Sequence, residues 1–471
     1  MLKINKFIMV MVMAFAFSFP FTGCGYSSDE TVNNEYYVNK EKAQDDIHLC
    51  ALFVAERIND SYYKPWMLSE VALTFLAINR EDIARDVLER AHNAALAMND
   101  ASYRADGLIE VARVYVKLGD INKAMDILKD VTMITPLTDV YREIIFSQKD
   151  KMDKEINDRI LLDLEGKIKN QQIESKDKGY AGVVGLFLLM DEPEKAYKTV
   201  SLINGEYLKI GALIDIIGDY SQSQDADAIA KNKDVDKLRN ELYEKINLVN
   251  DEFYKINLLN EYLKILMITG RNREAEVLIA QIELSAEKVK SKNLKSEILS
   301  NIASSYIAMG KRENAKKQLN GIKNIDAKVQ VLLELAKTEN EFGSAELAMA
   351  ECDGIRSKNK RSGLMAHIAE LYVTKGRLDK ALSVVQNMND DYTKPRMLAY
   401  MGELYAKENN TTKANELFDE ALEITTEITD NFYRSWALAE IAVRYTNAGM
   451  KPDAMAMKMI KEIVETTGTS K

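Results

Sequence analysis

The sequence predicts an all-α fold built as a solenoid of repeated helix–turn–helix units. Three observations support this prediction. Apolar residues along most of the 471-residue chain fall at steps of three and four, the period of one face of an α-helix. One block of residues recurs at regular distances, and many copies are followed by a glycine turn. Proline, which interrupts helices, occurs only 6 times.

The recurring block is the first helix of each unit. It starts at Leu or Met, continues with an apolar and then a small residue one turn later, and ends at an aromatic or apolar residue. We expect that last residue, for example Phe75 or Tyr306, to fill space between one unit and the next. Copies begin at Leu68, Leu108, Leu299, Met365, Leu398 and Leu438, and weaker copies at Leu259 and Leu332.

An alanine that follows each block marks the second helix of the unit. Its small side chain lets the two helices of a unit approach closely. These residues are Ala84, Ala124, Ala275, Ala315, Ala348, Ala381 and Ala414. The turns between the two helices contain Gly119, Gly270, Gly310, Gly376 and Gly449.

The distance between successive units takes two values. The interval from Tyr372 to Tyr405 is the shorter one and the interval from Tyr405 to Tyr445 the longer one, and both recur elsewhere in the chain. They differ by seven residues, which equals two helical turns. The longer units are therefore expected to extend their second helix without changing the face that it buries.

This pattern resembles the tetratricopeptide repeat, whose period is about 34 residues. The resemblance covers nearly all of residues 47–465 and implies a right-handed α-α superhelix of about ten units. It also implies that the first helices line an inner groove, which binds a protein or peptide partner. The candidate groove residues are Asn260, Lys264, Ser300, Ser304, Lys337, His367, Glu370, Arg396, Glu403, Lys407 and Trp436.

Residues 1–24 predict a targeting signal rather than a folded element. Lys3 and Lys6 precede an apolar run from Phe7 to Phe21, which is too short to span a bilayer and is typical of a signal peptide. The following residues, ending in Cys24, resemble the lipobox of bacterial lipoproteins. This resemblance implies lipidation of Cys24 and an extracytoplasmic place at the bacterial envelope. The alternative is an ordinary signal peptide with an incidental Cys.

The targeting signal and the regularity of the repeat spacing divide the chain into segments. We expect a signal peptide over 1–23, a lipidated Cys and polar tether over 24–46, regular repeats over 47–136, irregular helical repeats with a polar insertion near Ser221 over 137–250, and regular repeats with a capping helix over 251–471. The irregular centre is either a joint between two arrays or ordinary divergence.

Charged residues also recur with the units. A basic residue precedes the first helix core in eight copies, as at Lys64 and Arg104, and an Asp stands four residues earlier in many of them, as at Asp60 and Asp100. An Asp at that place can cap the helix N-terminus. We expect the basic residues to pair with the recurring glutamates, such as Glu110, in neighbouring units.

Composition argues against several classes of function. The formal net charge of −10 disfavours general nucleic-acid binding. Only 3 His and 3 Cys are present, so a metal site and a disulfide framework are not expected, and Cys50 and Cys352 are expected to be buried free thiols. No phosphate-binding, dinucleotide or hydrolase motif is found, so no cofactor and no enzymatic activity are expected.

The leading hypothesis is therefore a non-enzymatic scaffold that binds protein segments. One alternative is a structural subunit of an envelope assembly or secretion complex. A second is a small-molecule site or enzyme in the irregular centre. The discriminating observation for the second would be a deep pocket with convergent polar groups there.

Overall fold

A computed structural model describes residues 38–148, 153–222, 237, 239–339 and 342–467. The predicted signal peptide, Cys24 and most of the polar insertion lie outside the described residues. Residues 38–471 form one compact unit by themselves. Within the described part of the chain the secondary structure is helical and includes no strand, so the predicted all-α class is confirmed.

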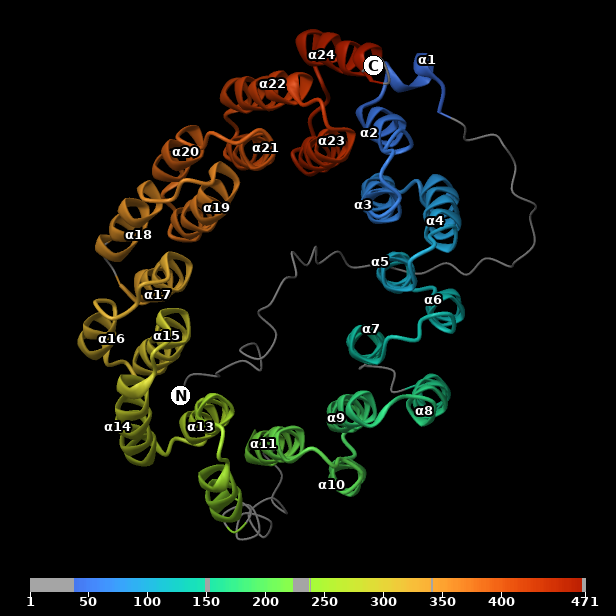
Figure 1. Cartoon of the computed structure of the whole chain (residues 1–471). Helices are drawn as coiled ribbons and strands as arrows, with labels where there is room; N and C mark the ends of the chain where they lie inside the picture. Colours follow the sequence, from blue (N-terminus) through green and yellow to red (C-terminus); the bar gives the residue numbers. More distant parts are fainter. Residues whose placement is uncertain (1–37, 149–152, 223–236, 238, 340–341, 468–471) are drawn as a thin grey trace. The chain divides into compact units, whose positions relative to one another are not determined.

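The helices are arranged as antiparallel pairs, one inner and one outer (Figure 1). Two short helices, α1 (Lys40–Ala43) and α2 (Ile47–Ala55), precede the first pair. The inner helices are α3 (Tyr63–Ala77), α5 (Ala101–Lys117), α7 (Ile134–Ser147), α9 (Ile173–Leu189), α11 (Glu206–Gln222), α13 (Glu252–Ile268), α15 (Lys292–Ala308), α17 (Ile325–Thr338), α19 (Lys358–Thr374), α21 (Thr393–Lys407) and α23 (Asn431–Asn447). The outer helices are α4 (Glu81–Leu96), α6 (Ile121–Leu128), α8 (Lys154–Lys169), α10 (Pro193–Val200), α14 (Asn272–Lys288), α16 (Arg312–Gln318), α18 (Gly343–Asp353), α20 (Leu378–Gln386), α22 (Thr411–Glu427) and α24 (Ala454–Thr466). Residues 239–248 are also helical and precede α13.

The turn between the two helices of a unit contains a residue in the left-handed backbone conformation, with positive φ. Gly119 and Gly376, at φ 78° and 67°, are two of the five glycines that take this conformation, which a residue without Cβ adopts at little cost. In three further turns the same place is taken by Asn79, Asp191 and Asn409, residue types that tolerate it better than most others. The predicted turns are thus present, with or without glycine.

Close approach of the two helices depends on the recurring alanines. All seven that the sequence singles out, from Ala84 to Ala414, are fully buried. The two repeat lengths also have the predicted cause. The longer units have outer helices of 16 or 17 residues, α4, α14 and α22. The shorter units have outer helices of 7, 11 and 9 residues, α16, α18 and α20.

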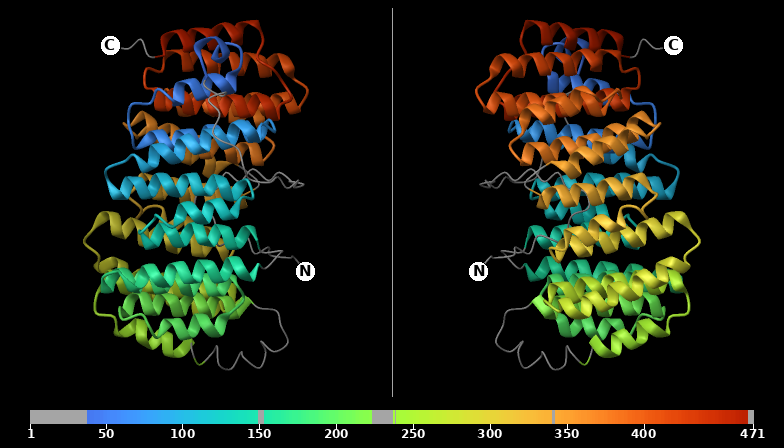
Figure 2. Two further views of the ribbon diagram at one scale, coloured as in Figure 1. Left: turned by 90° about the vertical axis from the view of Figure 1, so that its right-hand side faces the viewer. Right: turned by 90° about the vertical axis from the view of Figure 1, so that its left-hand side faces the viewer.

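The array closes on itself. Each inner helix packs against the next, from α3 through to α23, and α23 packs in turn against α2 and α3 (Figure 1). Taken by itself, the unit of residues 38–471 is therefore a ring in which the last repeat covers the first. The helices run side by side across both views of Figure 2. Periodicity alone does not predict this closure.

Residues 38–46, which the sequence assigned to the tether, belong to the folded unit. Val38 and Ala43 are buried, Asn39 caps α1, and α1 packs against α2 and α24. Pattern analysis did not predict a folded segment here, because Val38 and Ala43 are its only apolar residues and they form no helical period.

The recurring Asp residues cap the inner helices as expected. The Asp100 carboxylate accepts hydrogen bonds from the backbone N–H groups of Ser102 and Tyr103, and the Asp430 carboxylate accepts them from Phe432 and Tyr433. Each bond satisfies a backbone donor that the first turn of a helix leaves free.

The recurring basic residues have different partners from those predicted. Lys64, Lys255 and Arg434 donate to the backbone carbonyl oxygens of Glu56, Asn247 and Thr426, at 2.7, 2.8 and 3.3 Å. These carbonyls lie at the C-terminal end of the preceding helix. A cation there satisfies free carbonyl groups and complements the negative end of the helix dipole. The expected pairing with the recurring glutamates is wrong, because Glu110 and Glu261 bind Arg113 and Lys264 in their own helices.

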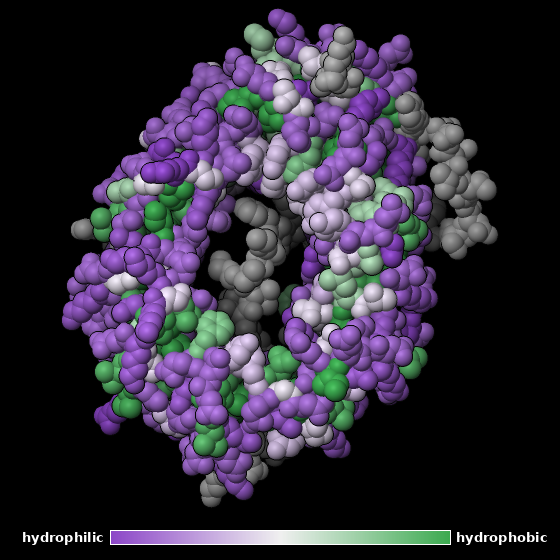
Figure 3. All heavy atoms as spheres, viewed as in Figure 1, coloured by the Kyte–Doolittle hydropathy of each residue, from purple (hydrophilic) through white to green (hydrophobic). Residues whose placement is uncertain are grey.

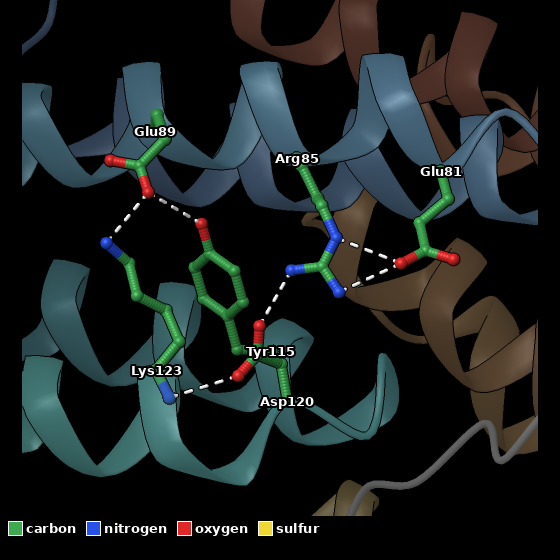
Figure 4. A network of polar contacts seen from close by, with 6 residues as sticks. All are labelled: Glu81, Arg85, Glu89, Tyr115, Asp120 and Lys123. Carbon is green, nitrogen blue, oxygen red and sulfur yellow. Dashed lines mark hydrogen bonds and ion pairs between the residues drawn. The ribbon is translucent and has the colours of Figure 1, made fainter. Parts of the chain in front are cut away.

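The tyrosine that ends the first helix of a unit ties inner to outer helices. The Tyr115 hydroxyl donates to the Glu89 carboxylate of α4 at 3.0 Å, and the Tyr405 hydroxyl donates to Asp379 of α20 at 3.1 Å. Figure 4 shows the first of these in a network in which Lys123 also reaches Glu89, and Arg85 bridges Glu81 and Asp120. The tyrosine therefore fills space between units, as predicted, and its hydroxyl fixes their register.

Candidate binding surface

The inner face of the ring is the surface that all units share. An inner helix packs against its two inner neighbours and against outer helices, so a mid-helix side chain that stays exposed faces the opening. Figure 3 shows this opening at the centre of one end of the ring. The inner helices, which come from the recurring block, therefore define the candidate surface.

Carboxylates recur at one level of this face, and we call them the carboxylate belt. All members stand near the middle of an inner helix and are at least partly exposed. They are Glu70, Glu110, Glu143, Asp215, Glu261, Glu334 and Glu440. At the same place in α15, α19 and α21 stand Asn301, His367 and Tyr400.

Neighbouring members of the belt affect one another's ionisation. Burial raises the pKa of Glu70, and the carboxylates of Glu110 and Glu440 raise it further, against the opposing effect of Lys117 and Arg396. Although the Asp215 side chain is exposed, the surrounding protein partly desolvates it and raises its pKa to about 6, with Glu261 contributing in the same direction. Like charges on adjacent helices disfavour a second negative charge. Belt members on adjacent inner helices, such as α11 and α13, thus interact electrostatically.

Basic residues relieve part of this repulsion within the belt. Arg113 binds both Glu110 and Glu143, at 2.5 and 3.1 Å, and Lys264 binds Glu261 at 2.6 Å. For Glu70 the described residues offer no ion-pair partner within salt-bridge distance. Glu70, where α3 lies between α5 and α23, is thus one of the belt carboxylates open to a ligand cation.

Aromatic residues gather at that same place, where the ring closes. We call the contact of α2 and α3 with α23 the seam. Trp66 packs edge-on against Trp436, with ring centroids 5.4 Å apart, and Tyr63 packs against Phe432 at 4.5 Å. In the same seam, the fully buried Ser435 hydroxyl donates to the Ala51 carbonyl at 2.9 Å.

Arg396 of α21 completes this group. Its guanidinium carbon lies 3.9 Å from the centroid of the Trp436 ring, a cation–π arrangement. Its Nε is buried and has no hydrogen-bond partner among the described residues. Burial lowers the pKa of Arg396, while Glu440 and Glu70 act in the opposite direction. The seam and Arg396 thus bring packed aromatic rings and both signs of charge together.

The sequence-predicted groove residues divide into three groups. Lys264, Lys337, His367 and Lys407 are exposed, and Ser300, Ser304, Glu370, Arg396 and Trp436 are partly exposed. Two are buried and do not line the face.

Asn260 and Glu403 are those two, at 5% and 4% exposure. Asn260 faces the core, because it shares a helix face with the buried residues Ile256 and Leu263, one turn away on either side. Glu403 is held by Arg444 at 2.9 Å and by Lys407. These ion pairs and burial leave its carboxylate unavailable to a ligand, so both residues are removed from the candidate surface.

Trp66 and Tyr63 are functional candidates that sequence reasoning missed. The chain contains 2 Trp, and each stands two residues before the first Leu of a unit, Leu68 or Leu438. This shared register was a signal that both rings face the same way. Their contact across the seam, however, depends on ring closure.

A pocket lies on α16 and α18, outside the irregular centre, and is lined by Arg312, Lys316, Glu339 and Leu347. Its Glu339 carboxylate is already bound by Lys316 at 3.3 Å and by the Ser344 N–H. This pocket therefore gives no support to a small-molecule site within residues 137–250.

One further sequence prediction concerns the cysteines. Cys50 and Cys352 are buried and free, as predicted. Within the described residues, no helix has the length and apolar character of a membrane span. The same part of the chain has no cluster of three or more metal-ligand residues.

No protein-family model matches the chain, and no curated protein matches it in sequence. Three solved structures are similar. The first is Ton1535 from Thermococcus onnurineus NA1, at 14% identity over 82% of this chain and 93% of that chain, with a TM-score of 0.23. The second is a circular tandem repeat protein with novel repeat topology and enhanced subunit contact surfaces, at 15% identity over 89% and 96%, with a TM-score of 0.20. The third is the human IFIT1 dimer with m7Gppp-AAAA, at 12% identity over 83% and 96%, with a TM-score of 0.27.

These likenesses are distant. The chain is an all-helical repeat protein that resembles tetratricopeptide-like structures, and this description rests on its own helix pairs and their spacing.

Proposed function

We propose that the chain is a non-enzymatic binding scaffold that holds a protein segment against the inner face of its ring, at a bacterial envelope to which Cys24 anchors it. One observation carries the proposal: Trp66, Trp436 and Arg396 lie together beside Glu70, a belt carboxylate without an ion-pair partner among the described residues. Aromatic and Arg side chains are the residue types that most often dominate protein interfaces.

A solenoid supports this role because its repeated helices offer one continuous surface. The units differ from one another where structure does not constrain them. His367, which replaces a belt carboxylate in α19, is exposed and lies 3.4 Å from Glu370. Its hydrogen bond to Glu370 raises the His367 pKa. Such differences give each sector of the inner face its own chemistry.

Residues 1–24 support the anchor and the location. The basic start, the apolar run and the small residues before Cys24 are the features of a lipoprotein signal. Acyl chains add about 0.8 kcal/mol for each buried CH₂ group. The anchor would therefore hold the ring at a membrane surface.

Site-specific photo-crosslinking in native envelopes tests the binding surface. A photoreactive phenylalanine analogue at His367 reports on the inner face, and the same analogue at Val277 of α14, which is 71% exposed, reports on the outer side. We expect discrete crosslinks to another protein from position 367 and none to that protein from position 277. Equal crosslinking from both positions, or none from position 367, would contradict the proposal.

The anchor has a separate test. We expect full-length protein to incorporate an alkyne-tagged fatty acid and to sediment with membranes, and a Cys24→Ala form to lose the label. A label that persists after Cys24→Ala would refute lipidation at this residue without bearing on the inner face.

A further inference from the structure

One end of the ring differs in chemistry from the other. We call it the N-rim: the edge at which outer helices end and inner helices begin. Because the inner helices follow their outer neighbours through loops on the same side, the N-rim collects their first turns. Helix α24 also ends there, on the side of the C mark in Figure 2. The opposite edge carries the glycine turns.

Exposed aromatic side chains gather on the N-rim. Tyr62, Tyr63, Tyr103, Tyr207, Phe253 and Tyr254 all stand in the first turn, or at the cap, of an inner helix, with 37–52% of their surface exposed. They contact each other between neighbouring helices, for example Tyr62 with Tyr103 at 4.6 Å and Tyr207 with Tyr254 at 4.8 Å.

Aliphatic side chains extend this apolar surface along the same edge. Ile173 and Leu248 are 69% and 78% exposed, and both stand in the connections that form the N-rim. The other edge has Phe146, Ile268 and Met455 as its exposed large apolar residues in the described chain. The apolar surface is therefore concentrated on one end, over the sector from α3 to α13.

The next sector of the N-rim is basic. The three connections 288–295, 320–328 and 353–361, which lead into α15, α17 and α19, contain ten Lys and Arg residues and two Asp residues. The chain as a whole, by contrast, has a formal net charge of −10. Positive charge is thus concentrated where the apolar sector ends.

These cations differ in whether they form ion pairs within the described chain. Lys328, Lys360 and Arg361 form ion pairs with Glu351, Asp326 and Asp353. Lys290, Lys292, Arg356 and Lys358 are exposed, and within the described chain no acidic side chain lies at salt-bridge distance from them. Exposed cations without an ion-pair partner among the described residues can bind an anionic partner.

We propose that the N-rim is a membrane-docking face, which seats the ring on a bilayer that contains anionic lipid. Tyr, Phe and Trp rings favour the boundary between lipid headgroups and acyl chains, because one part of the ring is apolar and the other accepts water. Basic residues near an anionic leaflet contribute about 1 kcal/mol each. Both kinds of group stand on the same edge, as contact with a flat surface requires.

Three acidic residues of the N-rim have a structural role that reduces their opposition to anionic lipid. Asp100, Asp251 and Asp430 use their carboxylates to cap helix N-termini, where the positive end of the helix dipole offsets their charge. The docking does not depend on Cys24: the anchor would bring the ring to the membrane, and the N-rim would set its orientation, with the opening facing the bilayer.

Vesicle flotation with residues 38–471, the compact unit, tests the docking face without the signal peptide or the acyl chain. The probes are phosphatidylcholine vesicles with and without phosphatidylglycerol, at low and high ionic strength. We expect binding to the anionic vesicles only, with loss at high salt. A triple variant, Lys290→Glu, Lys292→Glu and Lys358→Glu, is expected to bind about 100-fold more weakly, since three favourable charges are lost.

A matched control changes the same charge elsewhere. Lys154, Arg273 and Lys451 are exposed residues at the starts of α8, α14 and α24, on the opposite edge, and their replacement by Glu is expected to leave binding within about threefold. For the apolar sector, Tyr103→Ser with Tyr254→Ser is compared with Leu162→Ser and Val277→Ser on outer helices, and only the former pair is expected to weaken binding.

Circular dichroism melting of every variant distinguishes lost docking from lost folding. Equal binding to neutral vesicles, absence of binding to either vesicle, or an equal loss in the control triple would overturn the proposal. So would a salt-resistant dimer that depends on Tyr103 and Tyr254, because the apolar sector would then join two copies of the chain.

Discussion

Trp66 and Trp436, the two tryptophans of the chain, come from the first and last inner helices and pack edge-on with ring centroids 5.4 Å apart. Their contact exists only because α23 returns to α3. The Asn431 side-chain amide reinforces the seam by donating to the Arg57 carbonyl at 2.9 Å. Intrinsic tryptophan fluorescence therefore reports on the closure of the ring rather than on any single repeat.

The first prediction concerns the buried hydrogen bond of the seam. Ser435→Ala removes the donor to the Ala51 carbonyl, and the free energy of unfolding is expected to fall by about 1 kcal/mol. Denaturant titration followed by tryptophan fluorescence measures it. Ser300→Ala is the control, because the Ser300 hydroxyl bonds only to the Glu297 carbonyl of its own helix, and its midpoint should not move. An unchanged midpoint for Ser435→Ala would show that the seam does not limit stability.

The second prediction tests the basic residues that precede each core. Arg104 donates to the Met98 carbonyl at 2.9 Å, so Arg104→Met is expected to cost about 1 kcal/mol of stability through the loss of a charged hydrogen bond. Glu110→Gln, which leaves that bond intact, should cost less than half as much. The reverse order would restore the pairing between basic residues and glutamates that the sequence first suggested.

The third prediction concerns the two thiols. Burial raises the pKa of Cys352 to about 11 and raises that of Cys50 as well. Because the thiolate is the reactive form, neither residue should react with iodoacetamide at pH 8 while the protein is folded. Mass spectrometry of a Cys24→Ser form should show no added mass in buffer and two added groups in denaturant. Rapid labelling of either thiol in buffer would contradict the burial described for it.

The fourth prediction follows from a carboxyl group with a raised pKa. Burial and the nearby Asp453 raise the pKa of Asp419 to about 6, against an ordinary value of about 3.9 in the unfolded chain. The folded state therefore binds the proton more tightly, so stability falls as pH rises from about 4 to about 6. Asp419→Asn should stabilise the protein by about 1 kcal/mol at pH 7.5 after allowance for solvent screening.

That gain should disappear by pH 4, where the native Asp419 is already protonated. Thermal melts of both forms across this pH range measure the difference. Asp126, an exposed carboxylate on α6 that pairs with Lys129, provides the control, since Asp126→Asn should show no such trend. A gain for Asp419→Asn that does not depend on pH would exclude the ionisation as its cause.

The parts of the fold that the sequence predicts are local or repeated. The recurring Leu and Ala positions, the turns at Gly119 and Gly376 and the two lengths of the outer helices all express one rule that acts within a single unit. Asn79 and Asn409 escaped notice because a turn can be made without glycine. The partners of Arg104 and Lys255 were missed because a backbone carbonyl leaves no mark in the sequence.

The seam lay beyond sequence reasoning for a different reason. Closure depends on the small rotation between successive units summed around the ring, which no single unit encodes. Ser435 reads as an ordinary small residue until Ala51 is placed against it. Among the candidate surface residues, Lys264, Lys337, His367 and Lys407 are exposed on the inner helices. Asn260 and Glu403 are buried instead. The prediction missed this because the helical period fixes the direction of a side chain only to within part of a turn.

Closure has a consequence for how such a chain can change. In an open array a whole unit can be gained or lost, because each terminal repeat needs only a polar outer side. Here the apolar sides of α2, α3 and α23 cover one another, so removal of one helix pair would leave both without a partner. The number of repeats is thereby locked, and variation between related chains should accumulate as substitutions and loop changes instead of as duplicated units.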